Sequence, residues 1–63
     1  MTKAEEDLKA YNELIASSDC DRAFRIEQRY GLDGYPPSIV SGALSAIVRG
    51  EDMYEWIDNN ITQ

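Results

Sequence analysis

The sequence has no histidine and a single cysteine, Cys20, among its 63 residues. Without histidine, the chain lacks the side chain that most often transfers protons near neutral pH. A single cysteine excludes an internal disulfide, and together these absences exclude the usual zinc sites. The sequence also has no glycine-rich phosphate loop and no cluster of metal-ligating residues. We therefore expect a protein that is not an enzyme and that binds no metal and no cofactor.

Basic residues are scarce as well. Six lysines and arginines face twelve aspartates and glutamates, which gives a net charge of −6. Most of such a surface repels phosphate groups, so the charge disfavours direct binding to nucleic acid. No apolar run approaches the roughly 20 residues that cross a bilayer, and the polar N-terminus does not resemble a signal peptide. We expect a cytoplasmic protein that does not associate with membranes.

Apolar residues recur at helical spacing in four segments. Thr2 with Glu5 forms a capping box, Ser18 with Asp21 resembles a second cap, and Asp52 begins a third. Each of two later segments ends at a glycine, the residue that most often follows the last turn of a helix. We therefore predict one all-α domain, residues 1–63, with four short helices. Their predicted ranges are about 3–16, 19–30, 37–49 and 52–60.

The segment 39–48 holds no charged residue, although 29% of the chain is charged. A helix without a strong polar face is buried on most sides, so we predict that the third helix is central and that the other three pack around it. Ser38, Gly42 and Ala46 recur at every fourth position and form a smooth ridge on it. The ridge either receives helices of the same chain or forms the contact of a homodimer.

The predicted core takes residues from all four helices and from the loop before the third. Its members are Leu8, Tyr11, Leu14, Ile15, Phe24, Tyr30, Leu32, Ile39, Val40, Ala43, Leu44, Ile47, Val48, Tyr54 and Ile57.

The predicted fourth helix carries the residues that we expect to contact a partner protein. Trp56 lies on the flank of this helix, two residues after Tyr54, and aromatic residues of these types contribute much of the binding energy at protein interfaces. Glu55 and Asp58 belong to an acidic face of the same helix. Two alternatives stay open: Trp56 covers the edge of a small core, and the acidic face only keeps the protein in solution.

Arg22, Arg25 and Arg29 are spaced to form a basic stripe on the predicted second helix. Such a stripe can bind a carboxylate-rich partner or phosphates. Acidic residues interrupt it, so ion pairs within the chain are the alternative. The segment 30–44 also resembles a DNA-binding helix-turn-helix in the order of its elements. Its second helix, however, is apolar, and its loop is longer than the usual three or four residues.

These features favour a small acidic protein-binding module that occupies a surface of a larger protein. Regulators and inhibitors of the kind that phages and mobile elements encode act in this way. Two alternatives belong to other classes. One is a dimeric, helix-turn-helix-like regulator that binds nucleic acid through the arginine stripe. The other is a DNA mimic that inhibits a DNA-binding protein through the acidic faces of the first and fourth helices.

Overall fold

The computed structural model describes residues 2–61 and contains four α-helices in that range. These are α1 (Lys3–Ala16), α2 (Cys20–Arg29), α3 (Pro37–Val48) and α4 (Met53–Ile61). Each predicted helix is present, with both ends within one residue of the prediction, and the described chain has no strand. The prediction of a small all-α domain is confirmed.

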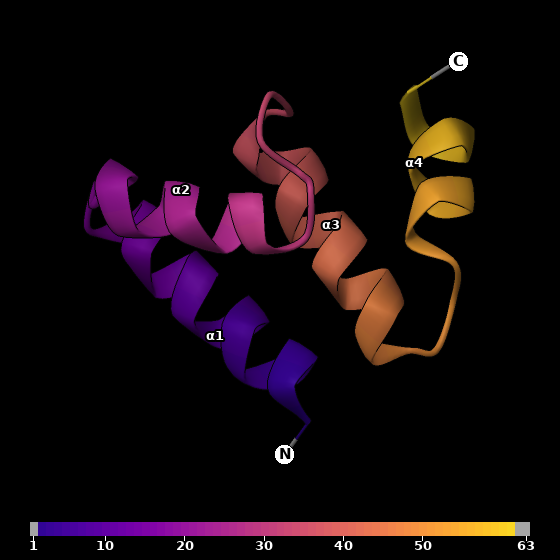
Figure 1. Cartoon of the computed structure of the whole chain (residues 1–63), viewed down its shortest axis with the longest axis horizontal. Coiled ribbons are helices and arrows are strands. Elements are labelled where there is room, and N and C mark those ends of the chain that lie inside the picture. The colour runs from indigo at the N-terminus through magenta and orange to yellow at the C-terminus, as the bar shows by residue number, and fades with distance from the viewer. Residues whose placement is uncertain (1, 62–63) are drawn as a thin grey trace.

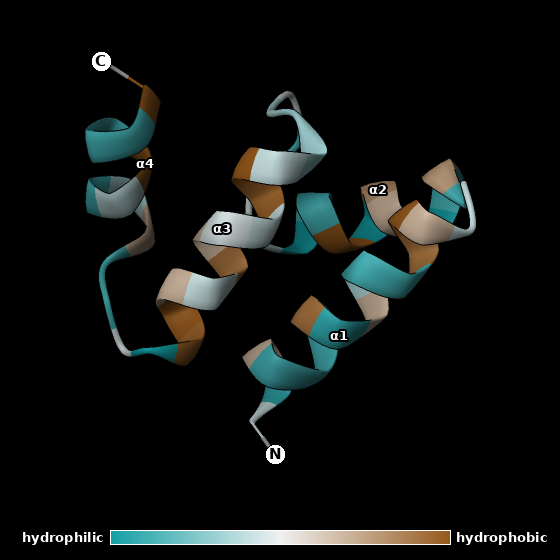
Figure 2. Cartoon of the chain, turned by 180° about the vertical axis from the view of Figure 1, so that it is seen from behind, coloured by the Kyte–Doolittle hydropathy of each residue, from teal (hydrophilic) through white to brown (hydrophobic). Residues whose placement is uncertain are grey.

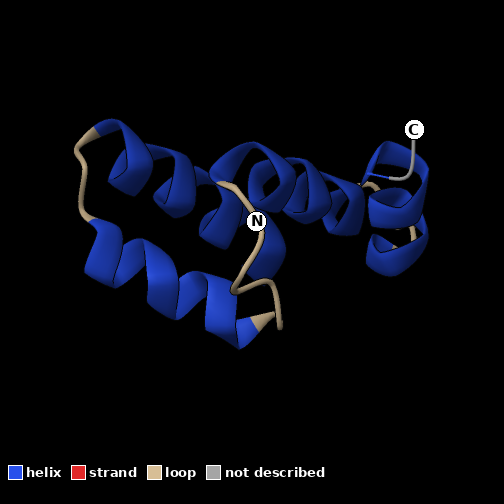
Figure 3. Cartoon of the chain, turned by 90° about the horizontal axis from the view of Figure 1, so that it is seen from above, coloured by secondary structure: helices blue, strands red, loops and turns tan. Residues whose placement is uncertain are grey.

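The helices cross one another and do not form an up-and-down bundle (Figure 1). α3 packs against α1 on one side and against α4 on the other, as predicted for a central helix. α2 packs chiefly against α1, so it does not surround α3 in the way that the other two helices do. Seen from above, α4 stands at one end of the molecule, with α1 and α2 toward the other (Figure 3).

Side-chain caps begin three of the helices. The Thr2 hydroxyl accepts a hydrogen bond from the Glu5 N–H, as the capping box predicted. Asp52 accepts from the backbone N–H groups at the start of α4, also as predicted. The predicted cap of α2 is wrong by one residue, because Asp19 accepts from the Arg22 N–H. Ser18 instead closes α1 in a left-handed conformation with φ 62°.

Two glycines end helices where the sequence placed them. Gly50 follows α3 with φ 82°, and the N–H of Glu51 donates back to the carbonyl of Ala46 at 2.9 Å. Gly31 follows α2 in the same way, and the Leu32 N–H donates to the Glu27 carbonyl. These Schellman motifs need a positive φ, which glycine adopts without a steric penalty. Both motifs turn the chain sharply, and the turn at Gly50 allows α4 to fold back onto α3.

The core lies along α3, whose ribbon is brown or pale for most of its length in Figure 2. Two predicted core residues are wrong: Phe24 is 46% exposed and Tyr54 is 63% exposed. Ile26 takes the buried position on α2, because it lies nearer than Phe24 to Ala23 around the helix. The buried apolar residues of the described chain are Tyr11, Ala23, Ile26, Leu32, Val40, Ala43, Leu44, Ala46 and Ile57.

The described chain buries one charged side chain, Asp7 on α1. Its carboxylate accepts a hydrogen bond from Nη1 of Arg29 at 2.8 Å and another from the Tyr30 hydroxyl. Nearby, the Tyr11 hydroxyl donates to Oε2 of Glu27 at 2.8 Å. A buried carboxylate is tolerated only when it is paired and hydrogen-bonded. This network therefore fixes how α2 lies against α1.

Burial by itself would raise the pKa of Asp7. The hydrogen bonds from Tyr30 and Arg29 and the charge of Arg29 outweigh that effect and hold the pKa below its ordinary value of 3.8. On the other side of the bond, burial and the contact with Asp7 raise the pKa of Tyr30 to about 12. The charged carboxylate and the neutral phenol are thus the states that stabilise the fold.

None of the helices within residues 2–61 is both long enough and apolar enough to cross a membrane.

We expect Asp7→Ala to lower the free energy of unfolding by about 2 kcal/mol, because Tyr30 and Arg29 lose a buried, charged partner. Urea denaturation followed by circular dichroism measures this loss. Glu6→Ala changes the neighbouring exposed carboxylate and should alter stability by less than about 0.5 kcal/mol. Equal losses in the two variants would contradict the role given to Asp7.

The stability that Asp7 contributes should also depend on pH. Because its pKa is lower in the folded state than 3.8, the contribution is fully present above that pH and is lost as the pH falls through the folded-state value. The difference in unfolding free energy between wild type and Asp7→Asn should therefore stay constant near neutrality and shrink below about pH 4. A difference that stays unchanged down to about pH 2 would show that folding does not lower the pKa of Asp7 and would contradict this account of the network.

Candidate protein-binding site

Trp56 is half-buried and lies against the backbone of Gly42 on α3. A Cβ atom at Gly42 would lie 2.5 Å from Cζ2 of the indole and closer still to Cη2, which no real pair of atoms tolerates. The glycine therefore provides the space in which the indole lies. Of the two interpretations of the small-residue ridge, contact within the chain is the one that the structure shows at Gly42.

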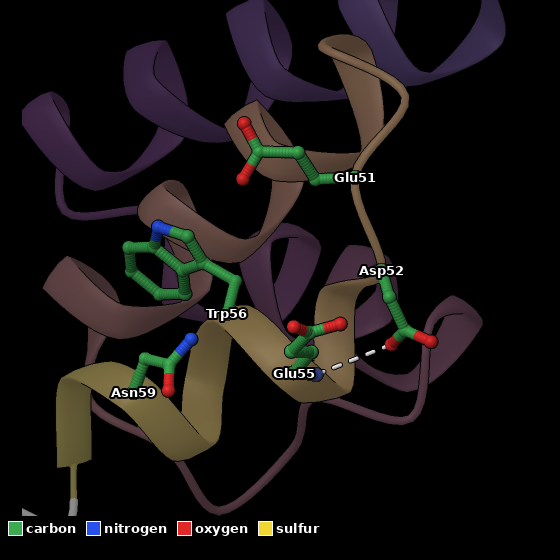
Figure 4. A pocket seen from close by; sticks show the side chains of 5 residues that line it. All are labelled: Glu51, Asp52, Glu55, Trp56 and Asn59. Atoms are coloured by element: carbon green, nitrogen blue, oxygen red, sulfur yellow. Dashed lines mark hydrogen bonds between the residues drawn. The ribbon is translucent and has the colours of Figure 1, made fainter.

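One side of the same indole lines a surface groove with a volume of about 220 Å³. The other walls are Glu51, Asp52, Glu55 and Asn59. Figure 4 shows the indole between the side chains of Glu51 and Asn59, with Asp52 and Glu55 toward the start of α4. The segment 51–52 and the first two turns of α4 thus combine an aromatic surface with three carboxylates.

Two of the three carboxylates already make contacts within the chain. Glu51 accepts a hydrogen bond from Nε of Arg49 at 2.8 Å, which lowers the pKa of Glu51 and raises that of Arg49. Asp52 caps α4 with one oxygen, Oδ1, which lies 2.9 Å from the Tyr54 nitrogen and 3.2 Å from that of Glu55. Both carboxylates are exposed, so these contacts hold them in place at the edge of the groove without covering them.

The structure separates the partner-binding residues predicted on α4. Trp56 and Glu55 both line the groove, whereas Tyr54 and Asp58 do not. Tyr54 and Asp58 are one helical turn apart on another flank, where Ile61 is also exposed at 45%. Tyr54 was expected in the core, but it is displaced because the Trp56 contact with Gly42 fixes which side of α4 faces α3.

Sequence reasoning missed Asn59 as a groove residue. Asn59 lies three residues after Trp56 and four after Glu55, so helical spacing places it beside both of them. That spacing is the signal that could have identified it, although an asparagine alone gives little reason to look.

The arginine stripe is partly used inside the fold. Arg29 donates to the buried Asp7, and Nε of Arg22 lies 3.6 Å from Oδ2 of Asp19. Arg25 is exposed. The stripe offers fewer uncommitted cations to phosphates than its spacing in the sequence suggested.

The structure also shows where the helices needed by the two alternative functions lie. α3, which would be the DNA-reading helix, packs against α1 and α4 and buries Val40, Ala43, Leu44 and Ala46. α1 and α4, the helices that carry the predicted acidic faces, lie on either side of α3 (Figure 1). Asp7 on α1 is buried and paired with Arg29, so its carboxylate is not part of an exposed acidic face.

The part of the chain that the structure describes has few clusters of side chains that could react or bind an ion. No three His, Cys, Asp or Glu side chains between residues 2 and 61 are grouped so that they could hold a metal ion. Cys20, the single cysteine and the first residue of α2, is exposed.

Comparisons with protein-family models, with curated proteins and with solved structures find no significant match for this chain.

We expect Gly42→Ala to lower the free energy of unfolding by about 1–3 kcal/mol, because the added methyl group displaces the Trp56 indole. This loss opposes the gain of about 1 kcal/mol that alanine normally brings to a helix interior. Ser45→Ala, on the same helix but without such a clash, should leave stability unchanged or raise it. Thermal or urea denaturation measures both, and a Gly42→Ala variant more stable than wild type would show that the indole does not lie on Gly42.

Proposed function

We propose that this protein is a small, non-enzymatic protein-binding module that occupies a surface of a larger protein through α4. The observation that carries the proposal is the groove in which one side of the half-buried Trp56 indole is surrounded by carboxylates. Tryptophan at the edge of a concave surface is typical of residues that dominate binding energy. Cytoplasmic location stays a prediction.

The way that α4 is anchored supports this role. Because α3 holds the indole from behind, the aromatic wall of the groove is in position before any partner arrives. A preformed surface loses little conformational entropy on binding, which favours affinity. Glu51 and Asp52 are likewise held by contacts within the chain.

Occupation of a partner surface needs no reacting groups, and it suits a regulator or inhibitor. The acidic residues add a long-range attraction toward a basic surface and speed the encounter with it. Such a module would act by excluding whatever else binds the same surface of the larger protein.

The test is affinity capture from the source cell with the tagged full chain, followed by identification of bound protein and nucleic acid at low and high salt. Wild type should retain one dominant protein. Charge reversal on α4, Glu55→Lys with Asp58→Lys, should reduce its recovery by about tenfold or more, because like charges at an interface are strongly unfavourable.

The matched control carries the same change in charge on α1, Glu6→Lys with Glu13→Lys, and should retain the partner. Circular dichroism verifies that both variants are folded. Equal loss in the two double variants would contradict binding through α4 and favour the DNA-mimic alternative, which uses both acidic faces. Nucleic acid recovered at low salt in place of a protein would favour the alternative in which the arginine stripe binds nucleic acid.

A further inference from the structure

The side chains that line the groove indicate which chemical class of partner it binds. This inference rests on the proposed function. Its walls contain one aromatic surface, three carboxylates and one amide, and no basic residue lines it. The chain as a whole carries a net charge of −6. A partner that complements both the shape and the charge is a basic segment that inserts a cationic side chain.

Arginine fits these walls better than lysine does. Its planar guanidinium stacks on aromatic rings while its N–H groups form paired hydrogen bonds with carboxylates. The structure holds an internal example, since Nε of Arg49 donates to one oxygen of Glu51 at 2.8 Å while Nη2 lies 3.5 Å from the other. A lysine ammonium is a compact, strongly hydrated charge with no planar surface to stack.

We infer that the groove lined by Glu51, Asp52, Glu55, Trp56 and Asn59 binds an arginine side chain from a basic segment of the partner protein. The guanidinium lies against the Trp56 indole and donates hydrogen bonds to the Glu55 carboxylate. Asp52 lies at the end of the groove toward the start of α4 (Figure 4). The rest of the basic segment runs over the acidic surface of α4.

The experiment titrates the full chain with a hexa-arginine peptide and follows the fluorescence of Trp56, the single tryptophan. A saturable change is expected for wild type. Glu55→Gln should weaken binding by roughly two- to fivefold, the effect of losing one exposed ion pair. Asp58→Asn makes the same change in charge on the same helix but outside the groove, and it should weaken binding less. A hexa-lysine peptide should bind more weakly than hexa-arginine.

Equal weakening by Glu55→Gln and Asp58→Asn would overturn the inference, because binding would then depend on net charge and not on the groove. Equal affinity for the two peptides, or no saturable change in wild type, would overturn it as well. These outcomes leave the capture experiment unaffected, since a partner can bind α4 without an arginine in the groove. Conversely, failure of capture does not alter the peptide result.

Discussion

The contact between the Trp56 indole and the Gly42 backbone is the constraint on which the candidate site depends. α4 has nine residues, and isolated helices of this length are marginal in water. Its position on α3 comes from burying Ile57 and half of Trp56, and a tryptophan brings more apolar surface to such a contact than any other residue. The same contact decides which flank of α4 faces outward and so creates the groove and exposes Tyr54.

A second constraint acts at the other end of the molecule. Asp7 binds Arg29 and Tyr30, and this network joins α1 to α2 through charge and hydrogen bonds, where α3 and α4 are joined through an apolar contact. Because Arg29 is paired with Asp7 in this network, the arginine stripe has one arginine fewer to offer to a partner. Segment 51–61 contains four acidic residues and no basic residue, so α4 and the turn before it are the end of the molecule where negative charge is concentrated.

Local patterns predicted the helices well, because caps, glycine stops and apolar spacing are properties of neighbouring residues. What the sequence could not decide was the rotation of each helix about its axis. On α2 the choice between Phe24 and Ile26 depends on contacts with α1, and on α4 the choice between Tyr54 and Trp56 depends on the space above Gly42. Asp7 lies one helical turn before Tyr11, on the same side of α1, but the partners that hydrogen-bond to it are more than twenty residues away. The groove depends on all of these choices, so only part of it, Trp56 and Glu55, was predicted as binding residues.

The most direct test of this account is a nuclear magnetic resonance measurement of the Gly42 α-protons. If the indole lies on Gly42, these protons should show nuclear Overhauser effects to the aromatic protons of Trp56 and a ring-current shift away from their ordinary positions. The shift should disappear in Trp56→Leu while the α1–α2 contacts remain. Gly42 α-protons at ordinary shifts, with no Overhauser effect to Trp56 in a folded protein, would contradict the position of α4 and with it the groove.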